Sequence, residues 1–207
     1  LNLPHELPIT GKHGKKRKVN FKTPWKRVDF IELVKKDCGL DVAKYKNPKD
    51  LVKDLKKKKI QVDDMEHMGL ATLIDNLYKK VSRPKIIDPV FLYHYPIELQ
   101  PLARRNDDDS EIVDQFQLVV GGWEIVKAYS ELVDPIDQEK RFKDQAKLKK
   151  SGDDETMEGD PEFVDSMKYG MPPISGWGMG IDRILTILTE QDNLRDVVFF
   201  PLMKPKE

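Results

Sequence analysis

Residues 176–183 read Gly-Trp-Gly-Met-Gly-Ile-Asp-Arg, and this octapeptide guides the interpretation of the whole chain. Glycines at alternate positions are typical of a β-strand that lacks side chains on one face, so a flat ligand or another backbone can approach that face closely. A helix follows directly and places Arg183 in its first turn, where a guanidinium can stack on an aromatic base and bind phosphate oxygens. A purely structural interpretation also exists, in which the glycines allow close helix–strand packing and Asp182 pairs with Arg183. The complete spacing and the apolar helix that follows favour a binding role.

The composition is typical of a folded chain with a buried core. Its 207 residues include 36 basic and 36 acidic side chains and are 39% hydrophobic, which fits one domain with or without an appendage. The single cysteine, Cys38, cannot form an intrachain disulfide or a thiolate metal cage, so we expect a reducing, cytoplasmic setting. No apolar run approaches the roughly 18 residues that span a bilayer, and we therefore expect no membrane partner.

The first 27 residues are expected to form a basic, flexible arm. Residues 12–27 contain eight lysines and arginines and no acidic side chain. A solvated terminus is one interpretation of this segment. Contact with a phosphate backbone is the other, because basic runs bind phosphates through counterion release. Residues 28–207 then form the expected domain, which begins with a helical region at 28–83.

Three helices are predicted in that region because apolar side chains recur at helical spacing between stop signals. They cover residues 30–38, 47–59 and 69–81. Asp29 is the N-cap candidate of the first helix and Gly39 its C-cap candidate. Pro84 closes the third helix, because the residue before a proline disfavours helical geometry.

From residue 86 onward the pattern changes to short β-prone pieces with interleaved helices. The runs 115–120 and 123–129 are joined by Gly121-Gly122, a strong hairpin signal because both turn positions can adopt a positive φ. The remaining predicted elements are helices at 137–150, 161–169 and 181–189, an acidic loop at 151–160 and a final strand at 197–200. This order predicts an α+β fold, with an antiparallel β-sheet flanked by helices. The sequence contains no Rossmann fingerprint and no Walker loop.

The octapeptide resembles motif 3 of class II aminoacyl-tRNA synthetases, and four further segments narrow the resemblance to the lysyl-tRNA synthetases. These segments are Pro101-Leu102-Ala103-Arg104, residues 130–142 with the sequence Ser-Glu-Leu-Val-Asp-Pro-Ile-Asp-Gln-Glu-Lys-Arg-Phe, Gly170-Met171-Pro172-Pro173, and the ending Phe199-Phe200-Pro201-Leu202-Met203-Lys204-Pro205. The similarity runs from about residue 20 to about residue 205. It corresponds to the carboxyl-terminal part of the catalytic domain.

The resemblance implies an aminoacyl-tRNA ligase that activates lysine with ATP and transfers it to tRNA. It also implies a cytoplasmic enzyme, a homodimeric parent protein and a requirement for Mg²⁺. Arg183 would be the catalytic residue that lies over the adenine and contacts the terminal phosphate. Gly176, Gly178 and Gly180 would line the ATP site with it.

Five further site residues follow from the resemblance. Gln117 and Glu124 correspond to two acids that hold magnesium against the ATP phosphates, so one acid has become an amide. An amide oxygen can still bind Mg²⁺ or one of its waters, but the site loses a negative charge. Lys127 and Glu131 correspond to an amide and a carboxylate that bind the lysine ammonium group. Tyr129 corresponds to an aromatic residue that lies along the aliphatic part of the substrate.

Lys127 departs from the family pattern, because a cation at this position repels a cationic substrate. Two interpretations remain open: Lys127 faces outward, or it pairs with Glu131 and occupies the substrate pocket itself. Strict strand alternation would also place Glu124 and Lys127 on opposite faces, so their convergence on one ligand requires a β-bulge between them.

Several family parts have no counterpart in these residues: motif 1, motif 2 with its α-phosphate arginine, and the anticodon-binding barrel. Family order places all three before residue 1, and the chain begins with Leu1 rather than Met. We therefore expect a fragment of a longer synthetase that does not aminoacylate tRNA by itself. The alternative is a synthetase-like binding or regulatory module that no longer activates lysine. An altered specificity, with Lys127 selecting an anionic substrate, is a further hypothesis.

Overall fold

The computed structural model describes residues 5–11, 14, 16–150 and 159–201. Seven strands lie in these ranges: β1 (Glu6–Thr10), β2 (Lys16–Asn20), β3 (Lys26–Asp29), β4 (Val90–Pro96), β5 (Ile112–Val120), β6 (Trp123–Ser130) and β7 (Ser175–Met179). The α-helices are α1 (Phe30–Cys38), α2 (Pro48–Lys57), α3 (Leu70–Val81), α4 (Pro135–Lys150), α5 (Pro161–Met167) and α6 (Ile181–Leu188). The predicted α+β class is confirmed, and none of the described helices is long and apolar enough to cross a bilayer.

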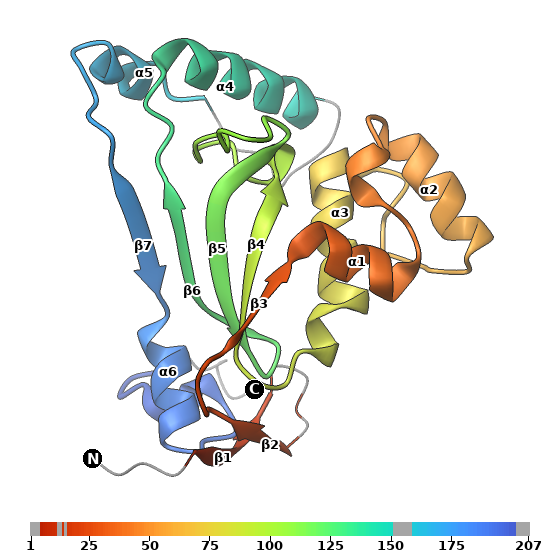
Figure 1. The fold of residues 1–207 in the computed structure, drawn as a ribbon, viewed down its shortest axis with the longest axis vertical. Helices are drawn as coiled ribbons and strands as arrows, with labels where there is room; N and C mark the ends of the chain where they lie inside the picture. Colours follow the sequence, from red (N-terminus) through yellow and green to blue (C-terminus); the bar gives the residue numbers. More distant parts are fainter. Residues whose placement is uncertain (1–4, 12–13, 15, 151–158, 202–207) are drawn as a thin grey trace, which may run out of the picture.

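A five-stranded sheet with the order β3-β4-β5-β6-β7 forms the centre of the structure (Figure 1). Three of its four strand pairs are antiparallel, as predicted. The edge pair β3–β4 is parallel, which the sequence analysis did not predict. The helices α1–α3 connect these two strands and return the chain to the same end of the sheet, and such a crossover produces parallel pairing.

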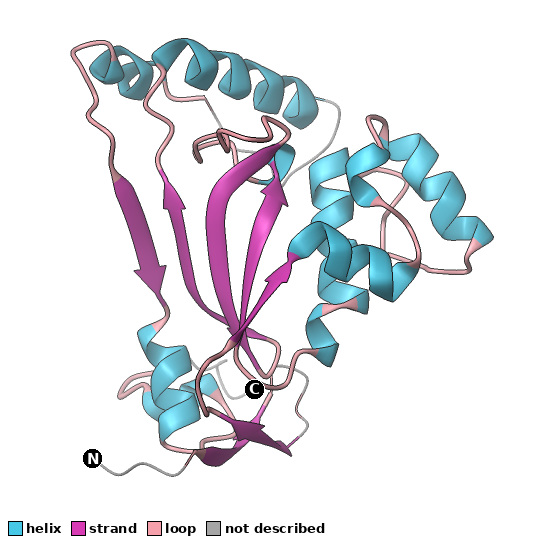
Figure 2. Ribbon diagram, in the orientation of Figure 1, coloured by secondary structure: helices cyan, strands magenta, loops and turns pink. Residues whose placement is uncertain are grey.

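Helices α1–α3 confirm the three predicted helices of residues 28–83 and lie together beside the β3–β4 side of the sheet (Figure 2). Asp29 caps α1 by accepting a 3.0 Å hydrogen bond from the Glu32 backbone N–H. Gly39 ends the helix with a φ of 70°, as a C-cap glycine should. These helices pack their apolar side chains against one face of the sheet, in a core that includes Phe30, Val34, Leu73, Leu77, Leu92 and Val119.

The basic segment before residue 27 forms a packed hairpin rather than the flexible arm that its charge predicted. Strands β1 and β2 pair antiparallel. Ile9 and Val19 are almost fully buried, at 2% and 0% exposure, in a small core with Leu118 and Val120. Apolar residues on these two strands alternate with exposed ones, so one face of the hairpin is buried. The intervening lysines and arginines made the segment look like a charged, flexible terminus. The correction applies only to the described residues of this segment.

Two other predictions concern the turn of the main hairpin and the end of the chain. The hairpin β5–β6 has Gly121 and Gly122 at φ values of 57° and 78°, which confirms the predicted two-residue turn. The strand predicted at 197–200 is wrong, because Val197 ends a 3-10 helix, Leu194–Val197, and residues 198–200 form no strand. Phe199 and Phe200 are 97% and 93% exposed and have no neighbouring strand in the described structure, so β-propensity alone did not produce a strand. Most of the predicted acidic loop at 151–160 lies outside the described residues.

Candidate functional site

Cross-strand pairing brings the predicted site residues onto one face of the sheet. Lys127 on β6 pairs with Gln117 on β5 and, on its other side, with Gly178 on β7. Tyr129 likewise lies opposite Gly176. Since directly opposed residues in antiparallel strands point to the same face, these side chains share the face that α1–α3 also cover.

A β-bulge in β6 adds Glu124 to this face. Leu118 pairs with Val126 and Val119 pairs with Glu124, so Ile125 is the extra residue. The extra residue restores Glu124 to the same side of the strand as Lys127, so the condition that the sequence analysis set for their convergence is met. The site residues of β6 therefore converge even though their spacing is odd.

Arg183 forms a hydrogen bond with the same bulge. Its Nη1 donates a 2.5 Å hydrogen bond to the backbone carbonyl of Glu124. A Cβ atom on Gly180 would lie 3.1 Å from the Arg183 Cδ, so the absence of a side chain there leaves room for the arginine to fold back. The half-buried guanidinium is thus held at the end of β7, beside Glu124.

The two other glycines of the octapeptide have different surroundings. A Cβ atom on Gly176 would lie 2.9 Å from Glu131 Oε1, so the missing side chain makes room for that carboxylate. A Cβ atom on Gly178 would have no neighbour within 4 Å, so open space lies over this residue. The open space adjoins Lys127, the cross-strand partner of Gly178.

Glu131 lies at the other end of β6, in a half-buried position. A cavity of about 430 Å³ adjoins it, with Ser130, Arg104 and Ser175 also in its wall. Burial raises the pKa of the Glu131 carboxyl above its ordinary value. Burial, followed by the charge of Glu131, also raises the pKa of Tyr129. A partly desolvated carboxylate beside an aromatic ring is a suitable partner for an ammonium group on an aliphatic chain.

The position of Lys127 agrees with neither interpretation offered above. Its side chain is half-buried on the inner face, so it does not face outward. Burial lowers the pKa of Lys127, and the carboxylates of Glu124 and Asp75 oppose that effect. Glu131 is not among the charges that act on Lys127. Within the described ranges, the Lys127 Nζ forms no hydrogen bond and no ion pair.

Sequence reasoning missed two residues that share this environment. Asp75 comes from α3 and forms an ion pair with Lys79 one helical turn away. Gln115 on β5 is 5% exposed and pairs across the sheet with Tyr129, yet both polar atoms of its amide lack a hydrogen-bond partner. The sequence offered one indication for Asp75 and Gln115: each is a polar residue within the apolar pattern of a helix or strand.

These residues do not fit the protein-held magnesium site that the resemblance implied. Mg²⁺ prefers carboxylate oxygens. Here the two expected ligand positions hold one carboxylate, Glu124, and one amide, Gln117, and Lys127 is the direct cross-strand partner of Gln117.

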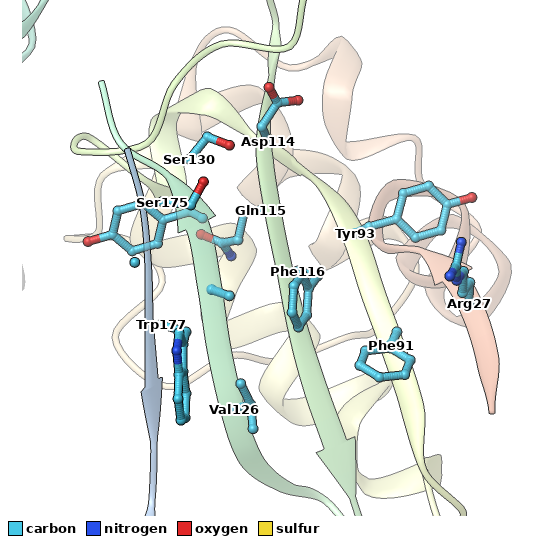
Figure 3. A pocket seen from close by; sticks show the side chains of 13 residues that line it. Arg27, Phe91, Tyr93, Asp114, Gln115, Phe116, Val126, Ser130, Ser175 and Trp177 are labelled. Atoms are coloured by element: carbon cyan, nitrogen blue, oxygen red, sulfur yellow. The ribbon is translucent and has the colours of Figure 1, made fainter. Parts of the chain in front are cut away.

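A second cavity, of about 930 Å³, lies on the opposite face of the sheet (Figure 3). Phe91, Tyr93, Phe116 and Trp177 point into it. Ala128 also lines it. Trp177 pairs with Ala128, one position away from the Gly178–Lys127 pair, and successive strand residues face opposite sides. Gln115, Tyr129 and Gly176 also line this cavity, so it adjoins the amino-acid end of the site, whereas Gln117, Glu124 and Lys127 are not part of its wall.

Comparison with known proteins identifies the family. Residues 7–204 match the family model of the class II tRNA synthetases (D, K and N). The chain is 43% identical over 190 residues to a lysine–tRNA ligase of Christiangramia forsetii, a match that covers 92% of this chain and 33% of that protein. It is 38% identical over 189 residues to a lysine–tRNA ligase of Pelotomaculum thermopropionicum, and this match covers 91% of this chain and 37% of that protein.

A third relative, the lysine–tRNA ligase of Aquifex aeolicus, is 37% identical over 189 residues, or 91% of this chain and 32% of that protein. The chain thus spans about a third of the length of these curated relatives. The match to the family model extends over nearly all of the chain, including both strands of the hairpin β5–β6 and the glycine strand β7. The chain belongs to the class II tRNA synthetase family of the D, K and N group.

Proposed function

We propose that this chain carries part of the active site of a lysine–tRNA ligase, which activates lysine with ATP and transfers it to tRNA. The observation that carries the proposal is the β6 bulge. Through this bulge Glu124 and Lys127 share one face. Arg183 is hydrogen-bonded to the Glu124 carbonyl at one end of β6, and Glu131 directly follows the other end. The names of the relatives support the choice of lysine.

The residues divide into an ATP end and an amino-acid end. Arg183 binds ATP with its planar guanidinium, and the unobstructed strand surface at Gly178 allows the nucleotide to approach. Glu131 binds the substrate ammonium group, and Tyr129 lies along the aliphatic stem. The strand surface between the two ends, which is unobstructed at Gly178, then brings the lysine carboxylate towards the α-phosphate.

Positioning and charge neutralisation are sufficient for the first chemical step. A carboxylate oxygen of lysine forms a bond to the α-phosphorus of ATP, the bond from that phosphorus to the bridging oxygen breaks, and pyrophosphate leaves. No protein nucleophile takes part. Arg183 stabilises negative charge that develops on the phosphates. We propose that magnesium arrives bound to ATP instead of being held by protein carboxylates.

The remaining partners follow from the same proposal. The acceptor of the activated lysine is tRNA, the protein acts as a homodimer, and it works in the cytoplasm. A second candidate function is a synthetase-like module that no longer activates lysine. The half-buried Lys127 ammonium beside Glu124 favours this alternative, because it places a positive charge near a cationic substrate.

Calorimetric titration with L-lysine tests the assignment of Glu131. The sample is the protein encoded by the full reading frame that contains this chain. We expect Glu131→Gln to raise the Kd for lysine roughly 30-fold or more, because removing one member of a desolvated charge pair costs about 2 kcal/mol or more. Glu139→Gln, at an exposed position on α4, is the matched control and should leave the Kd unchanged. Equal lysine affinity of wild type and Glu131→Gln would refute the assigned role.

A further inference from the structure

We propose that the ammonium group of Lys127 takes over the charge role of a magnesium ion beside Glu124 and binds the phosphates of ATP directly. This inference rests on the proposed function, because it concerns how the same face binds ATP. It also accounts for the mismatch between these residues and a protein-held magnesium site. The assignment makes Lys127 an ATP-binding residue rather than part of the amino-acid pocket.

The first argument is the pairing of Lys127 with Gln117. These residues lie directly opposite each other, which places their Cβ atoms roughly 5 Å apart. An uncharged glutamine and a lysine are thus direct cross-strand neighbours, and Glu124 is the carboxylate residue of β6. A metal ion held by Glu124 would face the Lys127 ammonium and be repelled by it, whereas a phosphate group would be attracted.

The second argument is the availability of the Lys127 donors. Within the described part of the chain, the Lys127 Nζ forms no hydrogen bond and no ion pair, although its side chain is half-buried. Asp75, the other carboxylate that acts on it, is already paired with Lys79. The three N–H donors of the ammonium are therefore free to bind an added anion.

The third argument is the space on the other side of Lys127. Gly178, its partner on β7, has no atom within 4 Å of an added Cβ position. Arg183 is bonded to the carbonyl of Glu124 at the end of the same bulge. A polyphosphate placed over Gly178 would thus lie between two cations. Lysine binds phosphate as a compact point charge, and arginine adds directional donors.

A count of bound metal ions tests the inference independently of catalysis. The probe is Mn²⁺, which is added to the protein encoded by the full reading frame together with a non-hydrolysable ATP analogue. Electron paramagnetic resonance counts the bound Mn²⁺ ions. We expect the wild type to bind at least one Mn²⁺ fewer per site than the double variant Gln117→Glu/Lys127→Asn, which restores the second carboxylate and removes the ammonium. The same count in both proteins would overturn the inference.

Nucleotide affinity gives a second readout. Lys127→Met should weaken binding of the analogue at least tenfold, Lys127→Arg should retain most of it, and Lys143→Met, at an exposed position on α4, should leave it unchanged. Thermal unfolding followed by circular dichroism verifies that each variant folds. Unaltered affinity in Lys127→Met also contradicts the inference. Lack of analogue binding by the wild type overturns the proposed function together with the inference, whereas binding with an unchanged Mn²⁺ count overturns the inference alone.

Discussion

Replacing Gly178 by alanine should stabilise the protein while it impairs nucleotide binding. Gly178 has no positive φ, and an added Cβ atom meets no atom within 4 Å, so the folded structure accepts the methyl group without strain. The unfolded chain loses conformational freedom, which should raise the free energy of unfolding by about 0.4–1 kcal/mol. The methyl group also occupies the strand face on which we place the polyphosphate.

Gly176→Ala is the matched comparison, because its added Cβ atom would lie 2.9 Å from Glu131 Oε1. That carboxylate would have to move by a few tenths of an ångström or more, so lysine binding should weaken. Urea unfolding followed by tryptophan fluorescence measures stability, and titrations with an ATP analogue and with L-lysine measure the two affinities. A loss of stability in Gly178→Ala, or nucleotide affinity equal to that of the wild type, would refute the reasoning.

Two further predictions concern stability and activity. Burial favours protonation of Asp137, but hydrogen bonds from Arg105 and Arg141 outweigh it and lower its pKa from 3.8 to about 2. Because the pKa is lower in the folded state, the stabilisation is present above pH 3.8 and is lost as the pH falls towards 2. Asp137→Asn should therefore lower the free energy of unfolding at pH 7 by about 2 kcal/mol in denaturant titrations, with little effect near pH 2; equal losses at both pH values would contradict this. The 207-residue chain by itself should form no detectable lysyl-tRNA in an aminoacylation assay, and product formation by it would show that motif 2 is dispensable.

Local signals in the sequence were sufficient for most elements of the fold. Asp29 and Gly39 mark the ends of α1 as capping chemistry requires, and the two glycines of the β5–β6 turn adopt the positive φ values that they alone favour. The bulge in β6 followed from the sequence only as a condition, because Glu124 and Lys127 can share a face only if one extra residue lies between them, and the register shift meets that condition.

The failures have a common physical cause in long-range packing. The charges of β2 conceal Val19, whose burial depends on contact with Leu118 and Val120, about a hundred residues away. Similarly, the influence of Asp75 on Lys127 depends on how α3 docks on the sheet. The final apolar run before Pro201 has the composition of a strand but no neighbour to pair with in the described structure, so composition alone misled the prediction.

The central claim is that the protein encoded by the full reading frame activates lysine. ATP–pyrophosphate exchange by that protein, measured with each amino acid in turn, tests this claim most directly. The account predicts exchange that depends on lysine and is much weaker with the other amino acids, even though Lys127 is present. Exchange with no amino acid, or exchange that depends on an anionic amino acid instead, would contradict it.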